Sequence, residues 1–273
     1  MKQIIENKIN QFVNYINDYN IQSLVIGLSG GIDSTLMAVL ANKVCSIVNI
    51  PLIGVSLPTL TNNSTETEIA HTVGELFCTE FKEVSIHSAY NELSEFVNEI
   101  GNSSKVPIPE GNIKARLRMI ILYHLAWHNK GIVLDTDNQT EHQLGFFTIH
   151  GDQGDFGLLN DLYKTEVFEL GKWIIDNWQL TSRQKEAIQL SLNLNPTDGN
   201  GCNPDLVQYG EPDFETVDKC LKDISVLGFV PKEIYDEHPT LATKWDRAWF
   251  KREGTPLYID KEGFLCNSRN EWL

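Results

Sequence analysis

Cysteine, positive charge and long apolar runs are all scarce in this sequence, and each shortage excludes a class of protein. The five cysteines are scattered and form no C-x-x-C pair, which argues against a disulfide framework and against a zinc site. With 22 Lys and Arg against 37 Asp and Glu, the net charge of −15 has the wrong sign for broad contact with nucleic-acid phosphates. No run is apolar enough to cross a bilayer, and the first residues lead into a mixed polar segment rather than a signal peptide. We therefore expect a cytoplasmic protein with no nucleic-acid or membrane partner.

The rest of the composition is that of an ordinary globular protein, because 41% hydrophobic and 22% charged residues over 273 positions can bury a substantial core. Short apolar runs alternate with segments of helical periodicity, which is the pattern of a parallel sheet connected by helices. We expect a doubly wound, Rossmann-like α/β fold with helices on both faces of the sheet and ligands at the carboxyl ends of the strands. The predicted helices cover residues 2–19, 33–45, 61–77, 89–100, 112–128, 162–178, 214–227 and 245–250, and the predicted strands cover 24–28, 50–58, 83–86 and 131–134.

The segment from Ser29 to Thr35 reads Ser-Gly-Gly-Ile-Asp-Ser-Thr and joins a predicted strand to an amphipathic helix. It is neither a Walker A loop nor a G-x-G-x-x-G motif, but its adjacent glycines allow a sharp turn and bring backbone N–H groups close to a ligand. The helix directs its unpaired N–H groups and its positive dipole end to the same place, which favours an anion. Asp33 would repel a bare phosphate unless a cation stood between them. The segment predicts pyrophosphate bound with Mg²⁺; the alternative is a turn in which Asp33 or Ser34 only caps the helix.

A second polar segment, Asp135 to His142, follows the predicted strand 131–134 and lacks the central glycine and terminal glutamate of a calcium-binding EF-hand loop. Since the carboxyl ends of parallel strands meet at one edge of the sheet, Glu141 can lie near Asp33 and share one Mg²⁺ with it. Two other stretches are rich in turn residues and have no apolar periodicity. We expect a mobile loop at 101–111 and a lid-like segment at 198–215, with a C-terminal extension at 216–273.

The order of the motifs along the chain, more than any one of them, resembles the ammonia-dependent NAD synthetases, a family of PP-loop ATP pyrophosphatases. The similarity covers about residues 20 to 200 and rests on Ser29–Thr35, Gly111–Met119, Asp135–Glu141, Gly145–Asp152 and Lys164. It implies one domain over 1–273, of the adenine nucleotide alpha-hydrolase type. It also implies ATP-dependent amidation of deamido-NAD through an acyl-adenylate, giving NAD, AMP and pyrophosphate, with Mg²⁺ as cofactor and a homodimer as the assembly. Free ammonia is the implied nitrogen source, because the chain is too short to hold a glutaminase domain as well.

The resemblance also implies roles for individual residues. The ATP-binding set comprises the glycine-rich turn with its flanks and three later residues: Gly27, Leu28, Ser29, Gly30, Gly31, Ile32, Asp33, Ser34, Thr136, Lys164 and Thr197. The residues implied to bind the acid substrate are Arg116, Phe146, Asp155 and Lys251, and those implied to hold the metal are Asp33 and Glu141. The residues expected to act in catalysis are Asp33, Lys164 and Asp155, and Asp155 or Asp152 is a candidate for taking a proton from ammonium.

The sequence departs from the family pattern at four places. Asp135 stands for a glycine, Ile149 for a lysine and Phe250 for a histidine, and a proline is missing from 158–160. The ATP-binding half is therefore intact while the dinucleotide-binding half is altered, which leaves open whether deamido-NAD is still the acid. One alternative is another PP-loop ligase that acts on a different carboxylate or on tRNA, and the charge of −15 disfavours tRNA. The other is a nucleotide-binding homologue without activity.

Overall fold

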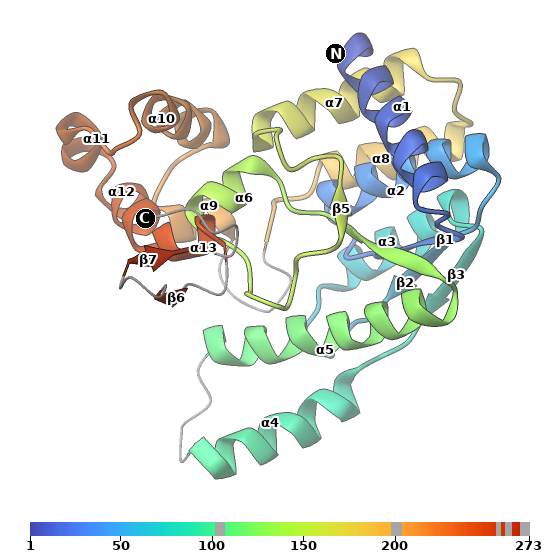
Figure 1. The fold of residues 1–273 in the computed structure, drawn as a ribbon, viewed down its shortest axis with the longest axis horizontal. Coiled ribbons are helices and arrows are strands. Elements are labelled where there is room, and N and C mark those ends of the chain that lie inside the picture. The colour runs from blue at the N-terminus through green and yellow to red at the C-terminus, as the bar shows by residue number, and fades with distance from the viewer. Residues whose placement is uncertain (102–106, 198–203, 255–257, 260–263, 268–273) are drawn as a thin grey trace.

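Five parallel strands form the central sheet, in the order β3-β2-β1-β4-β5 (Figure 1). The computed structural model describes residues 1–101, 107–197, 204–254, 258–259 and 264–267. The strands are β1 (Ser23–Gly27), β2 (Leu52–Ser56), β3 (Glu80–Glu83), β4 (Gly131–Asp135) and β5 (Phe156–Gly157). The chain builds outward from β1 to β3 and then returns to β4 on the other side of β1. This reversal creates a crevice between the carboxyl ends of β1 and β4, which is where open α/β sheets bind ligands.

Helices on one face of the sheet bury the larger apolar core. They are α1 (Lys2–Asp18), α2 (Ile32–Val48), α3 (Ser64–Phe77), α7 (Lys164–Asn177) and α8 (Ser182–Leu192). Leu24 and Ile26 of β1 point to this face because alternate side chains of a strand share one side. The ring of Phe12 in α1 stacks on that of Phe156 in β5, with ring centroids 4.0 Å apart. These contacts fix the position of α2, whose first turn follows the glycine-rich segment.

The opposite face of the sheet is covered by α5 (Pro107–His128), and α4 (His87–Gly101) packs along α5 (Figure 1). Val25 of β1 and Val133 of β4 meet Leu122 of α5 there. Glu110, in the first turn of α5, accepts hydrogen bonds from Tyr90 (2.5 Å) and Ser94 (2.7 Å) of α4. The start of α5, which lies beside the carboxyl ends of the strands, is therefore held in place by polar contacts.

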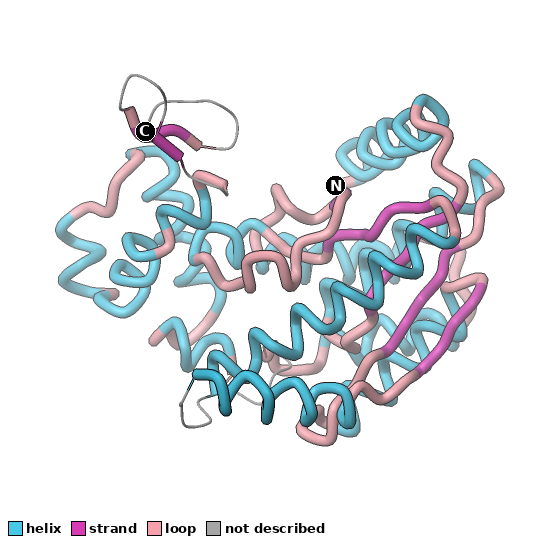
Figure 2. The backbone as a smooth tube through the Cα atoms, turned by 60° about the horizontal axis from the view of Figure 1, so that its bottom comes forward, coloured by secondary structure: helices cyan, strands magenta, loops and turns pink. Residues whose placement is uncertain are grey.

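The remaining helices gather beyond the carboxyl ends of the strands (Figure 2). They are α6 (Gln139–Leu144), α9 (Asp205–Tyr209), α10 (Phe214–Leu227), α11 (Lys232–Glu237), α12 (Pro239–Arg247) and α13 (Trp249–Arg252). A second apolar core, which includes Tyr209, Leu221 and Leu241, joins α9, α10 and α12 to α6. A two-stranded antiparallel sheet of β6 (Tyr258–Ile259) and β7 (Leu265–Cys266) follows. Among the described residues, no helix is long and apolar enough to cross a membrane.

The predicted fold class is confirmed, while several element boundaries differ from those expected. The structure places β3 at 80–83 rather than 83–86, and α5 begins at Pro107, so the loop predicted at 107–111 is a helical turn. Proline is tolerated there because the first N–H groups of a helix need no partner within the helix. Residues 205–209 form the helix α9 where an irregular lid-like segment was expected. Residues 102–106 and 198–203 of the two predicted loops lie outside the described residues.

Candidate active site

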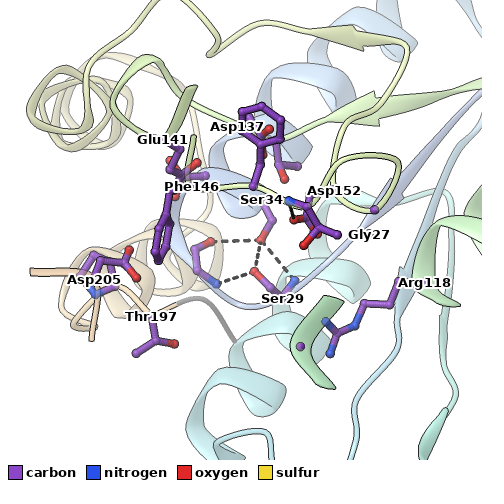
Figure 3. Close-up of a pocket in the computed structure, with 18 of the residues that line it drawn as sticks. Gly27, Ser29, Ser34, Arg118, Asp137, Glu141, Phe146, Asp152, Thr197 and Asp205 are labelled. Atoms are coloured by element: carbon purple, nitrogen blue, oxygen red, sulfur yellow. Dashed lines mark hydrogen bonds between the residues drawn. The ribbon is translucent and has the colours of Figure 1, made fainter. Parts of the chain in front are cut away.

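The glycine-rich segment between β1 and α2 forms a turn that is held by its own serines (Figure 3). The backbone N–H of Ser29 donates to Ser34 Oγ at 3.3 Å, and the two hydroxyl oxygens lie 3.1 Å apart. The N–H of Gly31 donates to Ser29 Oγ at 3.2 Å. These contacts fix the turn in front of the first turn of α2. They hold the turn beside the N-terminus of α2, whose first N–H groups have no partner within the helix, and this arrangement is suited to phosphate.

Gly30 is required by two features of the same turn. Its φ of +88° lies in a region that residues with a side chain rarely adopt. A Cβ atom at this position would also lie 2.0 Å from the carbonyl oxygen of Glu66, which belongs to the backbone of α3. The first glycine of the motif, Gly30, therefore allows α3 to lie close to the turn.

Asp33 and Glu141 are brought together by Lys164, the first residue of α7. The Lys164 ammonium lies 2.5 Å from Asp33 Oδ2 and 3.4 Å from Glu141 Oε1. Asn138 donates from Nδ2 to Asp33 Oδ1 at 2.9 Å and caps α6, whose third residue is Glu141. Asp33 follows β1 and Glu141 follows β4, so the two carboxylates meet at the crevice where the strand order reverses.

Several carboxyl groups surround the single ammonium of Lys164, and their charges and burial shift the pKa values of the site. Burial opposes the charged form of Lys164, but Asp33 and Glu141 outweigh burial and raise its pKa. Burial raises the pKa of Glu141 to about 8, with Lys164 acting against this shift and Asp33 adding to it. Burial, and then the charge of Asp135, raise the pKa of Asp137 well above its usual value. Lys164 is thus fully charged, and the site favours additional positive charge.

The donor set fits a magnesium ion that is completed by a ligand. Within the described ranges, no group of three or more His, Cys, Asp or Glu side chains is placed to hold a metal by itself. Asp33 and Glu141 instead offer two convergent carboxylates beside a phosphate-binding turn. Mg²⁺ is usually held in this way, by one or two carboxylates together with substrate phosphates and water.

A cavity of about 460 Å³ opens in front of these groups and contains most of the residues that the sequence predicts for the site. Of the predicted ATP-binding residues, all but Gly30 line it, and Phe146, Lys251 and Glu141 line it as well. Figure 3 shows Glu141, Phe146 and Asp205 on one side of the Ser29–Ser34 turn and Arg118 on the other. Thr197 donates to Glu66 at 3.0 Å across the cavity mouth.

Two predicted residues lie elsewhere in the part of the chain that the structure describes. Arg116 is exposed, does not line the cavity, and donates to the carbonyl of Ile149 at 3.2 Å. Asp155 accepts from Tyr123 (3.0 Å) and from the N–H of Val133 (2.9 Å), so it ties the start of β5 to β4 and α5. The structure therefore gives Asp155 a structural contact, and the role in catalysis expected for it stays a prediction.

The cavity is also lined by Asp152, the candidate proton acceptor, and by residues that the sequence did not single out, among them Arg118, Asp205 and Lys244. Arg118 lies two residues after Arg116 and thus on a different side of α5, where it donates to the carbonyl of Leu57 at 3.2 Å. Asp152 accepts from the N–H of Thr148 at 2.6 Å, and burial raises its pKa. Asp205 and Lys244 reach the cavity only because α9 and α12 pack against α6, and no local pattern marks them.

Comparison with known proteins gives a consistent result. A family model described as NAD synthase matches residues 4–184. The NH(3)-dependent NAD(+) synthetase of Methanococcus aeolicus is 33% identical over 178 residues, which are 62% of this chain and 66% of that protein. The protein of the same name from Methanocaldococcus jannaschii is 31% identical over 245 residues, 87% of this chain and 86% of that protein. Among solved structures, "NMN synthetase from Francisella tularensis" superposes with a TM-score of 0.75 at 27% identity, covering 93% of this chain and 97% of that chain.

The length of chain shared with these relatives varies. The chain spans 66%, 37% and 57% of the length of the first three curated relatives that it matches. The matched range 4–184 nevertheless runs from α1 into α8 and includes the turn, Asp33, Glu141 and Lys164. The chain belongs to the NAD synthase family.

Proposed function

We propose that this protein is an ATP-dependent ligase that amidates the carboxylate of a nicotinic acid nucleotide with ammonia, and that deamido-NAD is the acid. One observation carries the proposal. The phosphate-binding turn, two convergent carboxylates and the buried Lys164 meet at the crevice between β1 and β4. A pyrophosphate leaving group needs this combination of backbone donors, positive charge and metal-binding oxygens.

The reaction that follows has two steps. A carboxylate oxygen of the acid attacks the α-phosphorus of ATP, a P–O bond breaks, and pyrophosphate departs. Ammonia then attacks the acyl carbon, AMP departs and the ammonium proton is released, leaving the amide. No side chain needs to act as a nucleophile. The protein aligns the two substrates and neutralises charge that develops on pyrophosphate, which is the main source of catalysis in phosphoryl chemistry.

Individual residues divide this work. The hydroxyl groups of the Ser29–Ser34 turn, the first N–H groups of α2 and the Lys164 ammonium would stabilise the β- and γ-phosphates. Asp33 and Glu141 would hold Mg²⁺, which when bound supplies positive charge to the phosphate oxygens. Asp152, which lines the cavity and has a raised pKa, is a better placed candidate than Asp155 for accepting a proton from ammonium.

The mononucleotide acid that corresponds to NMN is the second candidate substrate, and two observations favour it. The solved structure with a TM-score of 0.75 is named an NMN synthetase. In addition, the residues that replace the family's lysine and histidine, Ile149 and Phe250, do not line the cavity within the described residues. Fewer charged contacts at the dinucleotide end would weaken the preference for the larger acid.

The decisive experiment measures AMP formation by the purified protein with ATP, Mg²⁺ and ammonium. Deamido-NAD and the mononucleotide acid are supplied separately, and their kcat/KM values are compared. A matched series replaces ammonium by glutamine, which tests the nitrogen source. Amidation of either nucleotide acid supports the proposed reaction, and the larger kcat/KM identifies the substrate. AMP formation with neither acid would refute it.

We also propose that the protein is a homodimer joined through the outer face of α4 and α5. Large apolar side chains are exposed there, among them Phe96 (60%), Ile100 (71%), Ile120 (65%) and Trp127 (83%). Large apolar side chains exposed on two neighbouring helices suit an interface, and two-fold dimers are the commonest assembly.

A further inference from the structure

Lys244 differs from the other cations that line the cavity. Lys164 pairs with two carboxylates, Lys251 donates to the carbonyls of Gly145 and Phe147, and Arg118 donates to the carbonyl of Leu57. No hydrogen bond or ion pair within the described residues involves the Lys244 ammonium. The ammonium lies over the face of the Phe146 ring, 5.7 Å from the ring centroid. Among the residues that the structure describes, no group therefore pairs with its charge.

The position of Lys244 is nevertheless well defined. Leu241 and Ala242 of α12 are fully buried in the second apolar core, and α12 packs against both α6 and α9. Lys244 lies three residues after Leu241 and is half-buried, with its ammonium over the ring of Phe146, two residues beyond the end of α6. Burial lowers the pKa of Lys244, and no carboxylate of the described residues forms an ion pair with it. Holding an ammonium here without a partner is unfavourable until an anion arrives.

The surroundings of Lys244 indicate which anion this is. The phosphates of ATP have their own donors at the Ser29–Ser34 turn and Lys164. Away from that turn, burial lowers the pKa of Lys251 most, the charges of Asp152 and Asp137 then raise it, and those of Lys244 and Arg116 lower it. Lys244 and Arg116 therefore lie near enough to Lys251 for their charges to act on it. The Phe146 ring adds an aromatic surface that points into the cavity (Figure 3). A cation next to an aromatic face matches an aromatic carboxylate or a nucleotide phosphate.

We propose that Lys244 binds an anionic group of the acid substrate, its carboxylate or its phosphate, and so determines the affinity of the site for that acid. This inference rests on the proposed function and adds a residue to it that the resemblance to the family does not assign. ATP does not need Lys244. Replacing Lys244 should therefore change the KM for the acid and leave the KM for ATP nearly unchanged.

The test is steady-state kinetics on Lys244→Met, which keeps an unbranched side chain and removes the charge, and on Lys244→Arg, which keeps the charge. Lys219→Met on α10, an exposed lysine of the same helical part, is the matched control. A lost charge-assisted contact predicts a rise of about 10- to 100-fold in the KM for the acid. The KM for ATP should stay within about twofold, and Lys244→Arg should recover most of the affinity.

Inhibition by the amide product separates the two sources of the anion, because the product keeps the phosphate and has lost the carboxylate. A product Ki that rises with the acid KM identifies the phosphate, and an unchanged Ki identifies the carboxylate. An acid KM equal to that of the wild type, or equal rises for ATP and for the acid, would overturn the inference while the wild-type activity stands. A wild-type protein that forms no AMP with either acid would instead refute the proposed function, and with it the role given to Lys244.

Discussion

Replacing Lys164 by methionine tests the charge balance of the site most directly. The Lys164 side chain is 3% exposed and lies 2.5 Å and 3.4 Å from the carboxylates of Asp33 and Glu141. Methionine keeps a side chain of similar length and leaves the carboxylates unneutralised. Removing one partner of a buried ion pair costs about 3–5 kcal/mol. We expect the lower end, about 3 kcal/mol, because the two carboxylates are 15% and 17% exposed and Asn138 still donates to Asp33.

The assay for this variant is urea unfolding followed by tryptophan fluorescence, with and without MgCl₂, together with the rate of AMP formation. Mg²⁺ should restore more stability to Lys164→Met than to the wild type, since the carboxylates then have no other cation between them. Turnover should fall by about 10²- to 10³-fold, as for the loss of one donor to a developing oxyanion. Lys172→Met, an exposed change in the same helix, is the control. A variant as stable as the wild type, with the same response to Mg²⁺, would show that Lys164 does not hold the two carboxylates together.

Three further predictions concern other parts of the molecule. Asp33→Asn and Glu141→Gln should each abolish AMP formation while the protein stays folded by circular dichroism, and near-normal activity in either variant at ordinary Mg²⁺ would exclude a shared metal. Combining Ile149→Lys with Phe250→His should lower the KM for deamido-NAD and leave the KM for ATP unchanged. If both KM values stay unchanged, these residues serve a different pocket. Trp127→Glu should convert the proposed dimer to a monomer by light scattering, and an unchanged mass would place the interface elsewhere.

The parts of the fold that the sequence predicts are those governed by local patterns. The apolar run before Ser29 and the run at 131–134 are found as β1 and β4, because buried parallel strands are continuous in hydrophobicity. The strand β5 has only two residues, Phe156–Gly157, which is too short for any periodicity to be seen. The strand β3 has mostly exposed side chains, so the apolar pattern favours a strand at the more apolar residues 83–86 that follow it. Short or solvent-facing strands are selected by their neighbours in the sheet and not by their own sequence.

The residues of the site also differ in whether local sequence patterns or tertiary packing determine their position. The turn that includes Gly30 is visible in the sequence because its function needs adjacent glycines and serines in order. The approach of Glu141 to Asp33 follows once the sheet is known to be parallel, although the placement of Lys164 between them depends on how α7 packs. Lys244 reaches the cavity through the second apolar core, which assembles residues from α6, α9, α10 and α12. Sequence motifs therefore identify the ATP-binding half, and tertiary packing is needed to find the residues opposite it.

The distribution of charge around the cavity explains why the two halves should respond to different conditions. Near Lys164, the charges of Asp33, Glu141 and Asp205 all raise the pKa of the lysine against the effect of burial, so negative charge is in excess where the triphosphate must bind. A polyanion would be repelled there unless a cation accompanied it, so we expect ATP binding to depend on a divalent ion. Among the described residues no carboxylate pairs with Lys244, so, under the role proposed for it, we expect the acid to bind without an accompanying ion. Salt should weaken this binding, and magnesium should not strengthen it.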